Sequence, residues 1–350
     1  MKPTSVSRRY FRDGGVSCWY HSSNISCNIR LCILQTHISG SDLTNVEAFS
    51  PYEPTLPVVI SRKEYDGLMR SYCRILAIEN IESAYDVFTT SAIELERFQL
   101  NAALECAYNH DTINWDILRH DLNIRVTSVL TSAATYVERL KRERRSLTNS
   151  ESAQEAISQL PSVIFDTSFE YRLGCSLRTF APHEQLPVSG LMFKTIVVEN
   201  HSEDFGRLVR HTFDPYIASQ QLIDAEKIPN RLKNELKTLD TNNFDLKTVF
   251  RVFYEAVAEM NYKFHEILKA QIHSDVERLE NLLRSIPSRD AQAKGEICFK
   301  PNTTAFSRLG EVSIPIAMEM RDRFNSFPKL YSASRAYISS EITLSRRDVT

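Results

Sequence analysis

The sequence predicts a mainly α-helical protein, a helical bundle with small β elements near the N- and C-termini. Long stretches in the middle of the chain repeat apolar residues at intervals of three and four, which is the spacing of one buried helix face. Only 9 of the 350 residues are glycine, a content typical of helices and low for folds built on glycine-rich phosphate-binding loops. Segments with alternating or β-branched residues, which favour strands, lie mostly near the two ends.

The two ends of the chain are predicted to carry the β elements. Residues 1–60 are expected to form a strand-like segment and a linker. The runs within residues 16–38 are consistent with a hairpin, whereas residues 39–57 contain one glycine and three prolines and are expected to be the linker. Residues 291–350 are expected to form a mixed segment that packs with the N-terminal strands. Its strand-like pieces are ICF, EVSIPIAMEM and AYISSEI.

Residues 61–290 are predicted to form the bundle. Ser61 is a predicted N-cap, with Glu64 at the third helical position as in a capping box. Two helices are expected within residues 62–108, separated by a break at residues 89–90. The second of them carries an apolar stripe made of Ile93, Leu100 and Leu104.

Two longer helices carry the strongest apolar stripes. One spans residues 111–146. The other spans residues 244–286, and its nearly heptad spacing could close the bundle or form a dimer face. Between these two helices the pattern predicts a short helix, then a helix over residues 162–180, a strand over residues 191–198 and a helix over residues 228–239.

Charge, cysteine content and missing motifs narrow the function classes. The net charge is −2 and the isoelectric point is near 6.5, so an RNA site would have to be a local basic patch. The seven cysteines are scattered without a C-x-x-C pair, which favours reduced thiols. The sequence contains no signal-peptide-like run, no 18-residue apolar window and no glycine-rich nucleotide motif. These features predict a cytoplasmic protein without a membrane partner.

The most informative stretch is the predicted helix over residues 162–180 and the turn that follows it. Pro182 lacks an amide hydrogen and disfavours the α conformation of the residue before it, so the helix is expected to end near Phe180. Arg178 then lies in the last helical turn and His183 in the cap below it. This ending matters because five residues of continuous helix would turn His183 by about 140° away from Arg178.

An arginine and a histidine separated by four residues near a helix end resemble the R-x4-6-H signature of HEPN domains. These are all-helical modules, many of which are RNA-cleaving toxins or defence nucleases. The pair here is Arg178-Thr-Phe-Ala-Pro-His183. Also similar to HEPN-type bacterial proteins are FEYR before the pair, LPV after it, and LNIRVTSVLTSAATYVERLKRE, which resembles the long helix beside the motif helix. The chain departs from the family at Thr179, where active members often carry Asn, Asp or His, and at Pro182. A second match, Arg30 to His37, lies in a strand-like segment.

The resemblance implies a metal-independent endoribonuclease without a cofactor, a hydrolase that binds RNA and acts as a toxin or as an antiviral phage-defence effector. In this chemistry the 2′-hydroxyl of the RNA attacks the adjacent phosphate. His183 would act as the acid and base, because histidine titrates near neutral pH. Arg178 would stabilise the phosphate with its planar fork of donors. The resemblance also implies a homodimer that brings two motifs together, and an antitoxin or defence-system partner.

Two residues near the pair are candidates for supporting roles. Thr179 could position a phosphate oxygen by a hydrogen bond. Tyr171 lies seven residues before Arg178 on the same helix face, so it could make a contact in the cleft or simply pack at the helix interface.

Other charged residues have less specific interpretations. Arg142, Arg144 and Arg145 end the helix over residues 111–146, where they could contact the RNA backbone or form a solvated helix end. His265 and His273 are expected at the surface or at an interface. A metal site is not predicted, because no cysteine or carboxylate set stands at ligand spacing.

The competing interpretation is a non-catalytic HEPN-like helical module. In this case Arg178 and His183 only cap the helix and hold the turn, and the bundle serves oligomerisation or partner binding. The near-neutral charge, Thr179 and Pro182 favour this alternative. Expression in bacteria would separate the two, since only an active nuclease should slow growth in a manner that depends on His183.

Overall fold

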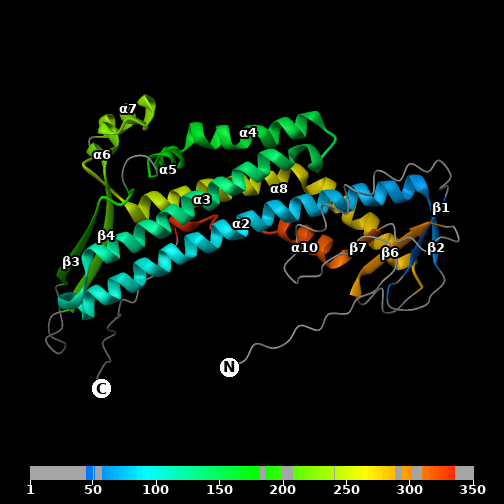
Figure 1. Cartoon of the computed structure of the whole chain (residues 1–350), viewed down its shortest axis with the longest axis horizontal. Helices are drawn as coiled ribbons and strands as arrows, with labels where there is room; N and C mark the ends of the chain where they lie inside the picture. Colours follow the sequence, from blue (N-terminus) through cyan, green and yellow to red (C-terminus); the bar gives the residue numbers. More distant parts are fainter. Residues whose placement is uncertain are drawn as a thin grey trace, which may run out of the picture.

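The computed structural model describes residues 45–49, 51, 57–181, 186–198, 208–239, 241–287, 294–301 and 310–335 of the chain. Within these ranges the protein is mainly helical, with two small antiparallel sheets, which confirms the predicted fold class. Three long helices dominate the molecule, namely α2 (Arg62–Tyr108), α3 (Trp115–Leu147) and α8 (Leu246–Ser285) (Figure 1). No helix in these ranges is long and apolar enough to cross a bilayer.

The long helices build one core with their apolar stripes. α2 and α3 form an antiparallel hairpin around a 3₁₀ turn at His110–Thr112, and α8 packs against α2. Tyr85 of α2 lies edge-on to Tyr136 of α3, with 5.4 Å between ring centroids, and Phe88 of α2 lies edge-on to Tyr254 of α8 at 6.2 Å. Shorter helices complete the bundle: α4 (Glu151–Thr167), α5 (Phe169–Phe180), α6 (Ser219–Asp224) and α7 (Asn230–Leu239).

α2 is a single helix of 47 residues, whereas two helices were expected. The helix continues through residues 89–90, where a break was expected. The Thr89 hydroxyl is buried there and donates to the carbonyl of Asp86 at 3.0 Å, so its hydrogen bond is satisfied inside the helix. The start of the helix agrees with the prediction. The Ser61 hydroxyl accepts from the amide of Glu64 at 3.2 Å, which caps the first turn.

A four-stranded sheet joins the two ends of the described chain. Its order is β2-β1-β6-β7, with β1 (Asn45–Phe49), β2 (Val58–Ser61), β6 (Glu296–Pro301) and β7 (Gly310–Ser313). β1 lies inside the segment expected to be a linker, and that expectation is wrong. Val46 and Ala48 alternate with more exposed residues and are fully buried, so pairing and burial outweigh the flanking prolines. The hairpin expected over residues 16–38 lies outside the described residues.

The predicted strand-like piece EVSIPIAMEM divides into two elements. Its first residues belong to β7, and the rest forms α10 (Ile314–Phe324), which packs on α8 and α2. Pro315 stands in the first turn of α10, where a missing amide hydrogen costs nothing. A proline at this point is therefore compatible with a helix, although the residues around it resemble a strand. ICF lies in β6 as expected, AYISSEI lies outside the described residues, and a 3₁₀ turn spans Ala333–Arg335.

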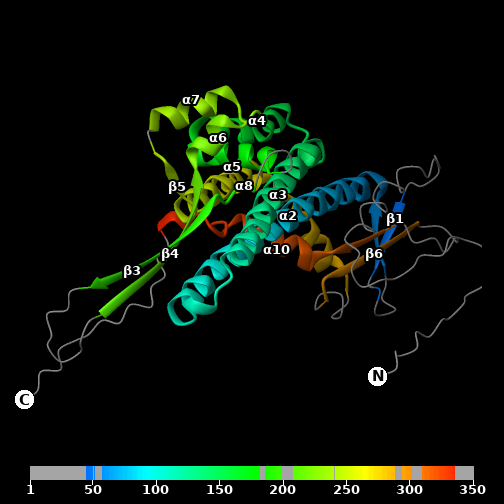
Figure 2. The ribbon, with the colours of Figure 1, turned by 60° about the vertical axis from the view of Figure 1, so that its left-hand side comes forward.

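A second sheet stands at the tip of the α2–α3 hairpin. It consists of β3 (Gly190–Val198), which confirms the predicted strand, β4 (Leu208–Ala218) and the short β5 (Asn243–Asp245). Figure 2 shows β3 and β4 extending away from the bundle. Phe213 of β4 is buried against Ala102 and Cys106 near the end of α2, so a small separate apolar cluster holds the sheet in place.

The helix predicted over residues 162–180 is interrupted. Residues 162–167 belong to α4, and α5 begins anew at Phe169. The break falls at Ser168, whose hydroxyl accepts from the amide of Tyr171 at 3.1 Å and so caps the new helix. The end of α5 at Phe180 agrees with the prediction, and the amide of Ala181 donates to the carbonyl of Leu177 at 2.9 Å.

Arg172 holds the break between α4 and α5 together. Its Nη1 donates to the carbonyls of Phe165 and Asp166 at 2.7 and 3.0 Å, which satisfies the end of α4. Its Nε and Nη2 donate to Glu235 of α7 at 3.2 and 3.1 Å. One mostly buried guanidinium therefore connects three helices.

Arg172→Ala is expected to lower the free energy of unfolding by about 2–3 kcal/mol, because it leaves partly buried acceptors without a donor. Urea unfolding followed by circular dichroism would measure the loss. The matched control is Arg231→Ala: Arg231 also pairs with Glu235, at 3.3 Å, but its side chain is 54% exposed, so a much smaller effect is expected. Equal losses for the two variants would contradict the role assigned to Arg172.

A polar cluster is buried between α2, α8 and α10. The Glu82 carboxylate accepts from Asn261 Nδ2 at 3.0 Å and from His265 Nε2 at 2.8 Å, and all three residues are at most 5% exposed. Arg323 Nη1 of α10 lies 3.6 Å from the second oxygen of Glu82. The His265 ring stacks on Phe324 with 4.1 Å between centroids. The expected surface or interface position of His265 is therefore wrong.

Candidate functional site

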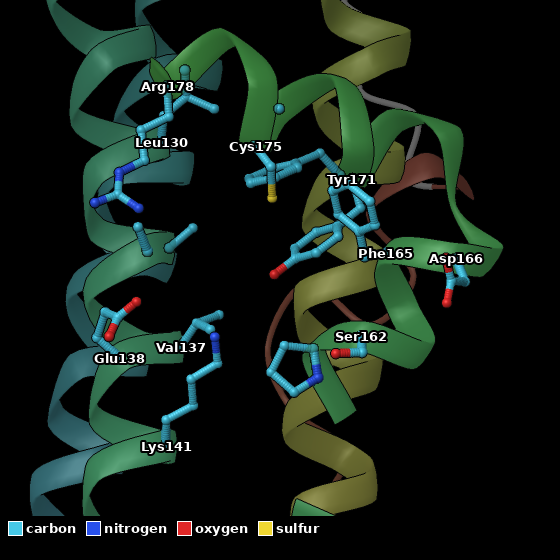
Figure 3. Close-up of a pocket in the computed structure, with 15 residues that line it drawn as sticks. Leu130, Val137, Glu138, Lys141, Ser162, Phe165, Asp166, Tyr171, Cys175 and Arg178 are labelled. Atoms are coloured by element: carbon cyan, nitrogen blue, oxygen red, sulfur yellow. The ribbon is translucent and has the colours of Figure 1, made fainter. Parts of the chain in front are cut away.

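A cleft of about 450 Å³ opens between α3, α4 and α5, with α8 beneath it. Figure 3 shows the α3 wall on one side and the side chains of α4 and α5 on the other. The lining residues are Leu130, Ala133, Ala134, Val137, Glu138 and Lys141 of α3; Pro161, Ser162, Phe165 and Asp166 of α4; Tyr171, Gly174, Cys175 and Arg178 of α5; and Phe253 of α8.

The sequence of α3 and α5 explains why this space stays open. Ala133 and Ala134 stand at the centre of the α3 wall, where larger side chains would close it. On the opposite side, Gly174 allows α5 to approach α8 closely, because a Cβ atom at this position would lie 2.5 Å from the ring of Phe253. Helix α5 therefore packs closely against α8, and its last turn faces α3.

Arg178 is the predicted site residue that the structure brings to the cleft. It lies in the last turn of α5 and is exposed, and Figure 3 shows its guanidinium extending along the α3 side of the cleft. Among the residues that the structure describes, Arg178 has no ion-pair or hydrogen-bond partner. A guanidinium without an anion at a cleft is available for a phosphate or carboxylate.

Lys141 is a second cation in the same cleft, which the sequence reasoning missed. It is exposed and, within the described ranges, its ammonium group has no ion-pair partner. Its position could have been found from spacing, because Lys141 follows Val137 by four residues and therefore continues the same face of α3. Glu138 adds one exposed carboxylate to this wall, whereas Asp166 is paired with Arg231 at 2.9 Å.

His183 and Pro182 lie outside the described residues. The structure establishes the end of α5 but leaves the meeting of Arg178 and His183 as a prediction. What it adds is the environment of the arginine, which is a cleft rather than a packed interface.

Tyr171 both packs in the core and lines the cleft. Its ring is 4% exposed and stacks on Phe253, with 5.7 Å between centroids and 15° between planes. Burial raises the pKa of Tyr171 well above its usual range, and the neighbouring Cys175 adds to this effect. The hydroxyl therefore stays protonated at neutral pH and cannot serve as a general base.

Cys175 is a second group in the cleft that sequence reasoning did not single out. Burial raises the pKa of its thiol, against the opposing effects of the Tyr171 hydroxyl and of the charges on Arg178 and Lys141. Because a thiol and not a thiolate is present at neutral pH, cysteine nucleophile chemistry is disfavoured at this site.

The remaining predicted residues do not line the cleft. Thr179 is exposed and its hydroxyl donates to the carbonyl of Cys175 at 3.4 Å. Arg142, Arg144 and Arg145 lie beyond Lys141 at the end of α3. Arg142 pairs with Glu143 at 3.0 Å, and Arg144 donates to the carbonyl of Lys141, so this cluster partly satisfies itself.

In the described part of the chain, no three His, Cys, Asp or Glu side chains lie close enough together to bind a metal ion.

Comparison of the chain with protein-family models, with curated proteins and with solved structures finds no match.

Proposed function

We propose that this chain is a metal-independent endoribonuclease of the HEPN type. The observation that supports this function best is Arg178, a guanidinium without a partner in the described structure, placed in the last turn of α5 at the edge of a cleft. The positively charged guanidinium attracts an anion, and the cleft has space for one. His183, five residues further along the chain, supplies the proton-transferring group.

The proposed reaction is an intramolecular transesterification of RNA. The 2′-oxygen loses its proton to a base and forms a bond to the adjacent phosphorus, while the bond from phosphorus to the 5′-oxygen breaks and that oxygen gains a proton. The products are a 2′,3′-cyclic phosphate and a 5′-hydroxyl. His183 exchanges the protons, and Arg178 stabilises the additional negative charge of the pentacoordinate phosphate.

A homodimer would supply two such motifs to one substrate, so that one histidine could take a proton and the other give one. We extend the proposal to a toxin or antiviral defence effector that is held in check by an antitoxin or another component of a defence system. Both points come from the resemblance of the sequence to HEPN proteins.

The test is RNA cleavage by the purified full-length chain in the presence of EDTA. His183→Ala and Arg178→Ala are each expected to lower the cleavage rate by about 10²–10³-fold or more. Because Arg178 is exposed, its replacement should leave the unfolding transition unchanged. The matched control is Arg70→Ala, an exposed arginine of α2 outside the cleft, which should keep activity. Full activity in either of the first two variants would remove the catalytic assignment.

A second candidate function, the non-catalytic helical module, is favoured by the surface of α2. The stripe of Ile93, Leu100 and Leu104 on this helix faces solvent, with exposed fractions of 38%, 41% and 55%, and Tyr108 extends it at 83%. An apolar helix face of this kind is typical of oligomerisation or partner binding. The cleavage assay separates the two functions, since a module without catalysis would give no His183-dependent product.

A further inference from the structure

The cleft has two chemically different sides. Arg178, Lys141 and Glu138 stand on the side of α3 and the end of α5, whereas Phe165 of α4 stands opposite them (Figure 3). Pro161 of α4 also lines the cleft. The cleft volume of about 450 Å³ lies within the usual range of small-ligand sites. A ligand that fits must therefore combine an anionic group with a flat apolar group at a short distance.

The charge of the cleft matches a phosphodiester. Of its charged residues, Asp166 is neutralised by Arg231. Arg178, Lys141 and Glu138 have no partner within the described structure, and together they leave one net positive charge. A phosphodiester linkage carries one negative charge, whereas a free 5′-nucleotide carries close to two. The balance thus favours a nucleotide within a strand.

The apolar side suits a nucleobase. Phe165 is only partly buried, so part of its ring is accessible from the cleft. Stacking of a base on an aromatic side chain contributes about 1–3 kcal/mol and tolerates any base. The Ser162 hydroxyl and the protonated Tyr171 hydroxyl add polar groups that could contact the edge of a base.

The walls of the cleft select against paired bases. Helices α3, α4 and α5 form the walls of the cleft and Phe253 of α8 lies beneath it, so a base that reaches Phe165 is expected to be unstacked and turned away from its strand. Bases in an RNA duplex are held in the stack and cannot do so.

We infer that this cleft binds one unpaired nucleotide of single-stranded RNA, with the phosphodiester at Arg178 and Lys141 and the base against Phe165. The inference rests on the proposed function for the choice of RNA, and it names the substrate class of the same site. It also assigns Lys141, Ser162 and Phe165 to substrate binding.

Binding is measured with the full-length His183→Ala variant, so that cleavage does not interfere. The probe is a short fluorescein-labelled oligouridylate, followed by fluorescence anisotropy. The same oligonucleotide annealed to its complement is expected to bind at least about tenfold more weakly. Unlabelled uridine monophosphate should compete poorly, and competition as strong as that of the unlabelled oligonucleotide would overturn the assignment to a strand.

Two pairs of matched variants locate the bound strand. Ser162→Trp places a bulky ring at the exposed rim of the cleft and should weaken binding at least about tenfold. Val163→Trp, at the exposed neighbouring position outside the cleft, should not. Lys141→Glu should likewise weaken binding at least about tenfold, whereas Lys63→Glu, a reversal of an exposed charge on α2 outside the cleft, should change it by less than about threefold. All four positions are exposed, so the variants are expected to fold, and melting curves would verify this.

These outcomes separate the inference from the proposed function. Equal binding by the two members of each pair would overturn the cleft as the binding site even if His183 proves essential for cleavage. Conversely, loss of binding confined to Ser162→Trp and Lys141→Glu would support the cleft even if the native chain does not cleave RNA.

Discussion

Glu82→Leu is expected to lower the free energy of unfolding by about 3–5 kcal/mol, because it removes one partner of a buried charged cluster. The carboxylate of Glu82 is the common acceptor for Asn261 and His265, at 3.0 and 2.8 Å. Both donors are at most 3% exposed, so water cannot replace the lost acceptor. Each buried donor left without a partner costs about 1–3 kcal/mol. Chemical denaturation monitored by circular dichroism would measure the loss.

A control on the same helix isolates the effect of burial. Glu94→Leu makes the same substitution at a side chain that is 52% exposed and that, within the described ranges, pairs with Arg97, so its effect should stay within about 0.5 kcal/mol. The double variant Glu82→Leu/His265→Phe removes one stranded donor while an aromatic ring remains above Phe324. It should therefore be more stable than Glu82→Leu alone. If the double variant lost the sum of the two single effects, the unsatisfied donor would not be the cause.

The fold was predictable from sequence where one periodic pattern determines an element. α3 and α8 follow apolar spacings of three and four, and β3 follows alternation, so local residues suffice to find them. β1 was missed because the three prolines that follow it indicate a linker, although β2, one of its two partners, is close in sequence. Its other partner, β6, is remote in sequence, and no local signal indicates this pairing, in which Val46 lies opposite Pro301. The break at Ser168 was missed because the apolar face continues across it, while a single capping hydroxyl and Arg172 decide the interruption.

The candidate site was likewise predictable only where a local sequence signal places a residue. The end of α5, and hence the place of Arg178, followed from Pro182 alone. Lys141 and Cys175 come to the cleft through the packing of α3 against α5, which no motif records. The position of His265 was also not predictable from local sequence. Its buried position depends on Glu82, a residue of another helix, and an isolated histidine in a helical pattern does not reveal such a partner.

Phe253→Ala is expected to lower the free energy of unfolding by about 3–5 kcal/mol, because it empties a large volume in a packed core. Phe253 is 3% exposed and lies beneath the cleft. Its ring stacks on Tyr171 and lies 5.9 Å from the ring of Phe250 and 6.3 Å from that of Phe88, measured between centroids. Loss of this ring should also weaken the proposed binding of RNA, because α5 then loses its support on α8.

Gly174 provides a compensating change for the same cavity. In the native chain, Gly174→Leu should be destabilising, because its Cβ would already lie 2.5 Å from the Phe253 ring. In Phe253→Ala the same leucine can enter the space that the ring left. Denaturation of both single variants and of Gly174→Leu/Phe253→Ala forms a double-mutant cycle, in which the double variant should exceed the additive expectation by at least about 1 kcal/mol. Strict additivity would mean that α5 does not rest on Phe253 through Gly174. In that case the close packing that opens the cleft toward α3 would need another cause.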